Sequence, residues 1–179
     1  MPGKIESPCI QPEPMSLTFT LADQADTPTL AALRNATAEA LTERFGLGPW
    51  TQAPRGMASP FDLRNGRVFV ARNDGLIVGH IRLQTKKPWA IDVSYFTPVS
   101  RALYITGLAV DPSVQRQGIG SMLILEAVRQ MRAFPAQALR LDAWDHAAGA
   151  GPFYIKCGFT DRGRVTYRKA PLIYFELIS

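Results

Sequence analysis

The sequence predicts an α/β fold, also described as α+β, in which helices flank a mixed and mostly antiparallel central sheet. Three observations support this prediction. Apolar and polar residues alternate in several short segments, as they do in strands that bury one face. The triplet Asn73-Asp74-Gly75 separates two such segments and is a strong β-hairpin signal. Two main helical segments interrupt the series of strands, and such crossovers are typical of α/β domains.

The length of the chain is that of one domain. With 179 residues, of which 46% are apolar, the chain can bury a substantial core. Residues 1–15 contain four prolines and few apolar side chains, so we expect a disordered lead. A single domain is then expected over residues 16–179.

The first elements are a strand and a long helix. Alternation of apolar residues from Leu17 to Leu21 predicts the strand. Asp26 or Thr27 is a typical N-cap, and Pro28 suits the first turn of a helix that runs to about Phe45 and ends at Gly46.

The remaining elements follow from apolar runs between turn signals. A helix is expected from Gly118 to about Arg132, and a short one before Gly158. Turn-rich insertions lie at residues 47–63 and 86–101. Further strands are expected at residues 68–72, 76–83, 102–110, 139–143, 159–167 and 172–178.

Charge and hydropathy limit the classes of partner. The net charge is +5, and the basic residues are scattered except for a cluster near the C-terminus, so we expect no nucleic-acid partner. The sequence has no segment of membrane-spanning length and no signal-peptide pattern, so we expect a cytoplasmic protein without a membrane partner. A homodimer remains open.

Cysteine and histidine are too few to predict a metal site or a disulfide framework. The sequence contains only Cys9, Cys157, His80 and His146, and none of them has the spacing of zinc ligands. We therefore expect no metal cofactor.

A glycine-containing loop after an apolar strand is the most informative feature. The run from Leu108 to Pro112 ends a strand, and Gln115-Arg116-Gln117-Gly118-Ile119-Gly120-Ser121 then opens a helix. Glycine lets the backbone approach a ligand closely, and the amides of a first helical turn attract phosphate. The dinucleotide-binding fingerprint fails because Leu123 stands where its last glycine would be, and no P-loop motif is present.

A second motif follows about thirty residues later. Residues 153–159 read Phe-Tyr-Ile-Lys-Cys-Gly-Phe, which is a short helix that Gly158 ends. Together, the glycine loop and this segment resemble motifs A and B of the GNAT family of N-acetyltransferases. The resemblance is strong from about Val68 to Phe159.

This resemblance implies a cofactor site. In the family, the sheet splays between the motif A strand and the next strand, and acetyl-coenzyme A lies in the opening. Backbone groups of Leu108 and Val110 would pair with the pantetheine arm. The pyrophosphate would be held by the loop residues Gln115, Arg116, Gln117, Gly118, Ile119, Gly120 and Ser121.

The resemblance also assigns a general acid. Tyr154 matches the tyrosine that many members use to protonate the departing sulfur. The general base stays open, because Thr106 stands where histone-type members carry a glutamate. Thr106 with a bound water and the side chains of Asp142, Asp145 and His146 are all alternatives, whereas His80 is expected to be a sheet residue.

The function expected is transfer of an acetyl group from acetyl-coenzyme A to a primary amine of an unidentified small molecule or peptide. The alternative is a non-catalytic sensor that binds acyl-coenzyme A. It is favoured by Thr106 and by Ala147, which replaces an asparagine that contacts the cofactor in many members. Acceptor-site candidates are Trp50, Trp89, Tyr95, Phe96, Asp62 and Asp92.

Overall fold

The computed structural model describes residues 16–52, 63 and 66–179. The expected lead of residues 1–15 and the candidate Asp62 lie outside the described residues. Seven strands form one sheet in the order β1-β2-β3-β4-β5-β7-β6. The strands are β1 (Leu17–Leu21), β2 (Arg67–Asn73), β3 (Leu76–Gln84), β4 (Ala102–Val110), β5 (Ala138–Trp144), β6 (Thr160–Tyr167) and β7 (Ala170–Ile178).

All neighbouring strands are antiparallel except β4 and β5, which are parallel. The expectation of a mixed, mostly antiparallel sheet is therefore confirmed. The helices are α1 (Thr27–Phe45), α3 (Ile119–Ala133) and α4 (Gly151–Lys156), and short 3-10 turns occur at η1 (Gln24–Asp26), η2 (Pro49–Gln52), η3 (Val93–Tyr95) and η4 (Pro112–Val114).

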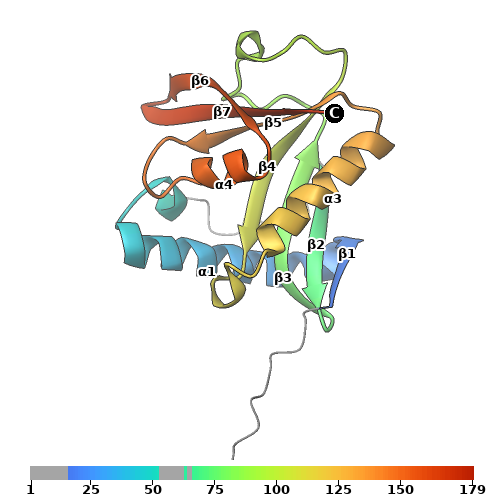
Figure 1. Cartoon of the computed structure of the whole chain (residues 1–179). Helices are drawn as coiled ribbons and strands as arrows, with labels where there is room; N and C mark the ends of the chain where they lie inside the picture. Colours follow the sequence, from blue (N-terminus) through green and yellow to red (C-terminus); the bar gives the residue numbers. More distant parts are fainter. Residues whose placement is uncertain (1–15, 53–62, 64–65) are drawn as a thin grey trace, which may run out of the picture.

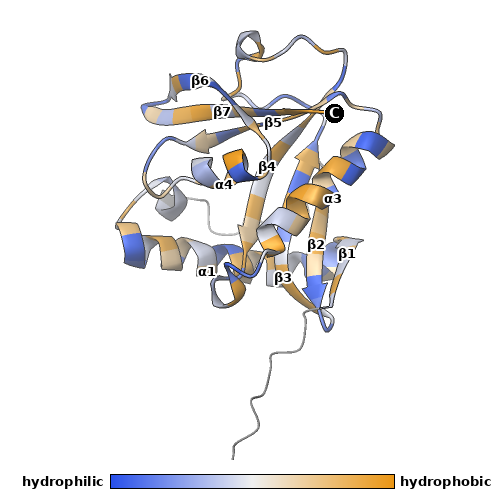
Figure 2. Cartoon of the chain, viewed as in Figure 1, coloured by the Kyte–Doolittle hydropathy of each residue, from blue (hydrophilic) through white to orange (hydrophobic). Residues whose placement is uncertain are grey.

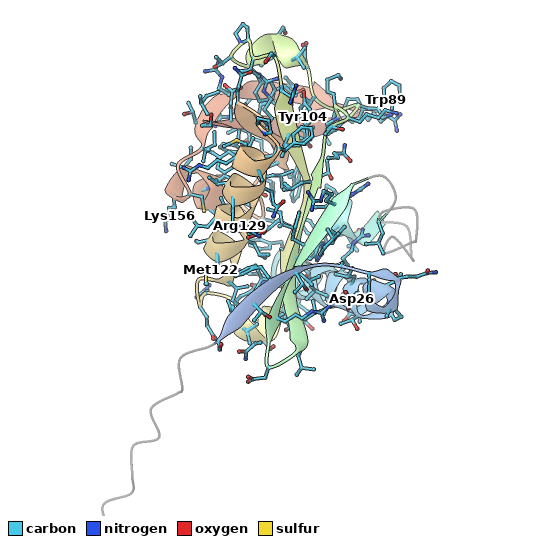
Figure 3. All side chains as sticks on the ribbon, turned by 90° about the vertical axis from the view of Figure 1, so that its right-hand side faces the viewer. Asp26, Trp89, Tyr104, Met122, Arg129 and Lys156 are labelled. Carbon is cyan, nitrogen blue, oxygen red and sulfur yellow. The ribbon has the colours of Figure 1, made fainter. Side chains whose placement is uncertain are left out.

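The helices α1 and α3 cover opposite faces of the sheet. Figures 1 and 3 show α3, which carries Met122 and Arg129, on one side of the strands and α1 on the other. The main core lies under α3 and α4, where Leu123, Met131 and Leu139 are fully buried. Figure 2 shows apolar residues concentrated along the central strands and on α3.

The face covered by α1 holds two smaller apolar clusters. Leu30 of α1 packs against Val68 and Val70 of β2. Beyond them, Ile91 and Phe96 from the 86–101 insertion pack against tyrosines of the sheet. Because only Leu30 and Leu33 of α1 are buried, this helix covers its face less completely than α3 covers the other.

A buried ion pair fixes the insertion to the sheet. Arg140 of β5 and Glu176 of β7 lie 3.0 Å apart, and their side chains are 6% and 2% exposed. The Glu176 carboxylate also accepts hydrogen bonds from the backbone and hydroxyl of Thr97, while Arg140 donates to the Thr97 carbonyl. The insertion is thereby held at the start of β4, and Figure 1 shows it at the end of this strand opposite to η4.

The hairpin between β6 and β7 differs in detail from the expected one. The sequence predicts that the last strand begins at residue 172, but Ala170 and Pro171 already pair within β7. The turn is instead made by Arg168 and Lys169, which have φ of 49° and 70°. Two consecutive positive φ angles match the right-handed twist of the hairpin strands. Arg168 and Lys169 adopt them although arginine and lysine do not favour positive φ.

Candidate active site

The parallel strands β4 and β5 separate in the middle of the sheet. Their pairing is limited to three residue pairs, the last of which joins Tyr104 to Arg140. Beyond this point, the register between β3 and β4 shifts so that Thr106 is an extra residue on β4. A β-bulge of this kind bends its strand and disrupts the ladder. The expected opening between the motif A strand and the next strand is thus present, and Thr106 lies where it begins.

The edge of β4 that faces the opening carries backbone groups of alternate residues. The amide of Asp111 donates to the Val78 carbonyl of β3 over 2.9 Å. Because backbone groups of successive residues point to opposite edges, those of Leu108 and Val110 face the opening. The Val110 carbonyl already accepts a 3.1 Å hydrogen bond from the side chain of Gln115. The Leu108 groups and the Val110 amide are left to pair with a ligand.

The loop after β4 turns the chain sharply into α3. Asp111 accepts hydrogen bonds from the amide and the hydroxyl of Ser113, which fixes the first turn. Arg116 and Gly118 then have φ of 64° and 85°. Gly118 is the N-cap of α3, and a Cβ placed there would meet no atom within 4 Å. The space in front of this glycine is therefore open.

The N-terminus of α3 presents free backbone donors to this space. The first helical hydrogen bond runs from the Met122 amide to the Gly118 carbonyl, so the amides of residues 119–121 have no partner within the helix. The side chains of Arg116, Gln117 and Ser121 are exposed, whereas Ile119 is 1% exposed and packs in the core. Ile119 can thus reach a ligand only through its backbone.

Gly120 has a packing role that the sequence did not suggest. A Cβ on this residue would lie 3.2 Å from the ring of Phe153 and 3.9 Å from Val110. The missing side chain at Gly120 leaves room for α4 to approach α3, rather than for a ligand to approach the backbone. Only Gly118 therefore fits the expectation that a glycine here leaves space for a ligand.

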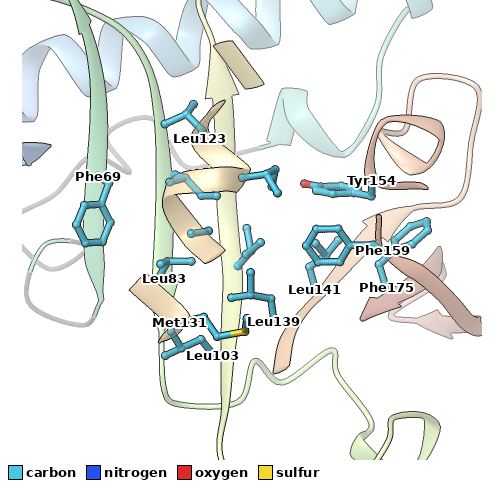
Figure 4. Packing of buried hydrophobic residues seen from close by; sticks show 14 of the residues in the cluster. Phe69, Leu83, Leu103, Leu123, Met131, Leu139, Leu141, Tyr154, Phe159 and Phe175 are labelled. Carbon is cyan, nitrogen blue, oxygen red and sulfur yellow. The ribbon is translucent and has the colours of Figure 1, made fainter. Parts of the chain in front are cut away.

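Tyr154 projects from α4 toward β4. Its ring is 7% exposed and packs against Phe153, Phe159 and Phe175 at centroid distances of 5.2, 5.6 and 5.6 Å. Figure 4 shows the hydroxyl on the side of the ring that faces β4. This hydroxyl makes no hydrogen bond with any residue in the described part of the chain. The structure thus brings a phenol with an unused proton to the opening.

The ionisation of Tyr154 is strongly suppressed. Burial raises the pKa of the phenol above its usual value, and the nearby Asp142 carboxylate and Cys157 sulfur raise it further. The phenol therefore keeps its proton at physiological pH and cannot be the base that takes the first proton from an ammonium group. Cys157 lies beside the start of α3, with its sulfur 3.9 Å from the Ser121 hydroxyl.

The candidates for a general base have different surroundings. The Thr106 hydroxyl oxygen is enclosed and has no hydrogen-bond partner within the described residues. Asp145 forms an ion pair of 3.0 Å with Arg164. The ring of His146 stacks on Trp144 at 4.2 Å, and its Nδ1 accepts a 3.3 Å hydrogen bond from Ala148.

His80 and Asp142 both lie on the α1 side of the sheet. Burial and, to a lesser extent, the positive charge of Arg34 lower the pKa of His80 to about 4. Its Nδ1 atom has no hydrogen-bond partner among the described residues. His80 is thus a neutral sheet residue, as expected. Burial raises the pKa of the Asp142 carboxyl. Asp142 thus places a half-buried carboxyl group beside the opening.

The aromatic candidates for an acceptor site are not brought together. Trp50 lies against Trp144 at the end of β5, with ring centroids 4.9 Å apart. The others belong to the insertion at the opposite end of β4, where Phe96 is buried and Trp89 is 85% exposed. Figure 3 shows Trp89 projecting away from the sheet. Asp92, in the same insertion, caps η3 through the Ser94 amide.

Sequence reasoning did not find Trp144 as part of this region. Trp144, Trp50 and His146 form a continuous aromatic group where β5 ends. A signal was present, because Trp144 stands two residues after Asp142 in a strand and therefore shares its face. The contact with Trp50, which comes from a distant turn, could not be read from spacing.

Among the described residues, no group of three or more His, Cys, Asp or Glu side chains could hold a metal ion. In the same part of the chain, the helices lack the length and apolar character that crossing a bilayer would need.

Comparison with known proteins identifies the fold and the family. The model of the Acetyltransferase (GNAT) family matches residues 30–159. The PaiA N-acetyltransferase from Thermoplasma acidophilum, solved with coenzyme A, is 17% identical; the match covers 89% of this chain and 98% of that chain, with a TM-score of 0.68. A GCN5-related N-acetyltransferase from Rhodopseudomonas palustris is 21% identical, with coverages of 92% and 98% and a TM-score of 0.66.

An acetyltransferase from Bacillus subtilis, solved in complex with coenzyme A, is 15% identical; the match covers 92% of this chain and 99% of that chain, with a TM-score of 0.60. These likenesses show the fold, whereas the family match spans most of the chain. The resemblance to the family that motifs A and B indicated is confirmed. The protein belongs to the Acetyltransferase (GNAT) family, and it is therefore an acyltransferase.

Proposed function

We propose that the protein transfers an acetyl group from acetyl-coenzyme A to a primary amine of a small molecule or peptide. One observation carries this proposal. The opening between β4 and β5 has a helix N-terminus with unpaired amides at one end and the unpartnered hydroxyl of Tyr154 at its side. The first feature suits a phosphate group and the second suits a leaving group that needs a proton.

The residues present fit such a donor. The Leu108 groups and the Val110 amide form an unpaired strand edge, to which an amide-containing arm adds as a further strand would. The amides from Arg116 to Ser121 hold the pyrophosphate, and Gln115 positions the loop by its bond to the Val110 carbonyl. Because the contacts to phosphate use the backbone, the side chains of Gln117 and Ile119 are not constrained by the ligand.

Tyr154 acts as the general acid in this proposal. As the amine attacks the thioester carbon, the carbon–sulfur bond breaks and the sulfur leaves as a thiolate that needs a proton. The phenol carries its proton at physiological pH, since burial raises its pKa above an already high value, and its hydroxyl faces the opening. Its aromatic contacts fix the ring, so the proton is held at a defined position.

The proposal is tested by thiol release from acetyl-coenzyme A in the presence of amines. The panel contains polyamines, aminoglycosides, amino acids and short peptides, and the acetylated product is identified by mass spectrometry. We expect release above the rate without amine for at least one class. Binding of coenzyme A without release for any amine would instead support the alternative of a non-catalytic sensor.

A further inference from the structure

The buried and half-buried carboxylates of the described residues have partners, with one exception. Among the described residues, each buried or half-buried Asp or Glu other than Asp142 receives an ion pair or a hydrogen bond from another residue. The pairs are Asp26 with Arg72, Asp111 with Ser113, Glu126 with Arg129, Asp145 with Arg164, and Glu176 with Arg140. Within the same part of the chain, the Asp142 carboxylate has no such partner.

The position of Asp142 explains where this unpaired charge is directed. The residue follows the last pairing of β5 with β4 by two positions and lies opposite Tyr174 of β7. Leu139 and Leu141 belong to the core under α3, so Asp142, which alternates with them, points to the other face. The carboxylate is thus at the rim of the opening, on the face that α1 covers incompletely.

The groups that surround Asp142 do not neutralise it. Tyr154 of α4 and Tyr174 of β7 lie on opposite sides of the sheet, and the Asp142 charge raises the pKa of both phenols. Arg140 precedes Asp142 on the same face, but its guanidinium is bound to Glu176. Since burial without a cation is unfavourable for a carboxylate, an incoming cation stabilises it.

Aromatic rings extend the site away from the opening. Trp144 lies on the same face as Asp142 and contacts Trp50 and His146. A carboxylate that shares a sheet face with a tryptophan is a favourable environment for an organic cation, because the carboxylate and the indole ring both attract positive charge.

We propose that the carboxylate of Asp142 binds the ammonium group of the acceptor and takes its first proton. This inference rests on the proposed function and assigns the acceptor class, a primary amine that arrives as a cation. Tyr154 and Asp142 then act from opposite sides of the sheet, the first on the leaving sulfur and the second on the attacking nitrogen.

The proton transfers balance. The ammonium nitrogen gives one proton to Asp142 and, as a neutral amine, forms a bond to the thioester carbon. The carbon–sulfur bond breaks with its electron pair on sulfur, and Tyr154 protonates that sulfur. The second proton leaves the nitrogen and restores the Tyr154 phenol. Asp142 releases the first proton to water, so the products are an amide, coenzyme A thiol and one proton.

The test compares Asp142→Asn with Asp161→Asn, a control on β6 whose carboxylate is paired with Arg164. The probe is the best amine of the panel, and kcat/KM is measured from pH 5 to pH 9 together with coenzyme A affinity. For Asp142→Asn we expect unchanged affinity, a loss in kcat/KM of at least about a hundredfold at neutral pH, and the loss of the acid limb of the profile. The control should keep kcat/KM within about threefold and retain that limb.

Thermal unfolding provides a second readout, which does not need an acceptor. Removal of an unpaired carboxylate should leave the midpoint of Asp142→Asn unchanged or higher, whereas a structural carboxylate would lower it. A lower midpoint for Asp142→Asn, or equal kcat/KM of an active parent and this variant, would overturn the proposed role of Asp142 and leave the proposed function standing. A parent that acetylates no amine would overturn the proposed function and this inference together.

Discussion

The hydroxyl of Tyr154 can be removed with little effect on the fold, which makes Tyr154→Phe an informative substitution. The ring contacts with Phe153, Phe159 and Phe175 are retained in the variant. The hydroxyl makes no hydrogen bond in the described part of the chain, so its removal leaves no donor or acceptor unpaired. We expect the free energy of unfolding to change by less than about 1 kcal/mol.

The expected loss is confined to the rate. General acid catalysis contributes about a hundredfold to ten-thousandfold, which corresponds to about 3 to 5 kcal/mol of activation free energy. The assay measures turnover by thiol release and coenzyme A affinity by calorimetry, in the same preparation. We expect kcat to fall by at least a hundredfold, with affinity within a factor of about two.

Tyr174→Phe is the matched control. The Tyr174 hydroxyl accepts a 3.0 Å hydrogen bond from the Asp92 amide and donates to the Ala90 carbonyl. Its loss should lower the unfolding free energy by about 1 to 3 kcal/mol and leave turnover nearly unchanged. A Tyr154→Phe variant that keeps kcat within about threefold of the parent would show that Tyr154 is a packing residue.

Three further predictions test the loop, a buried histidine and the expected absence of a metal. Gly118→Asp places a negative charge at the open N-cap and should abolish coenzyme A binding detectable by calorimetry. Gly120→Ala, whose added methyl group would press on the Phe153 ring, should mainly lower the midpoint of thermal unfolding. Equal coenzyme A affinities of Gly118→Asp and the parent would place the phosphate elsewhere. The pKa of His80 is lowered from 6.5 to about 4 in the fold, so the unfolded chain binds more protons between these pH values, and the free energy of unfolding falls by up to about 3 kcal/mol as the pH falls through this window. The free energy of unfolding of His80→Gln should depend less on pH in this window. Parallel pH profiles of the variant and the parent would contradict this. Activity should survive treatment with a chelator, and a loss that added metal restores would reveal an overlooked metal site.

Much of the fold followed from local pattern. A few neighbouring residues are enough to predict the hairpin at Asp74 and Gly75, the apolar strand β4 and the start of α3 at a glycine. The start of β7 was expected at residue 172, because proline is typical of turns, but Pro171 already lies in the strand. Proline is tolerated in β7 at a position opposite Thr166, near the end of the ladder.

The candidate site was only partly predictable. The loop and Tyr154 could be found because their function depends on residues that are close in sequence. The bulge at Thr106 depends on a register shift against β3, and the role of Gly120 depends on the position of the Phe153 ring. The unpaired state of Asp142 is a property of every surrounding element, so no spacing within the sequence could indicate it.

Three local features that are unfavourable for the folded chain alone lie around the same opening. Thr106 interrupts a ladder and encloses an unpartnered hydroxyl, the loop to α3 needs a positive φ at Arg116, and Asp142 is half-buried without a cation. Elsewhere in the described chain, buried carboxylates such as Glu126 and Glu176 have arginine partners. Such costs persist where a ligand compensates for them or where they position reacting groups. Their concentration between β4 and β5 is thus an argument for this opening as the catalytic centre that is independent of the family motifs.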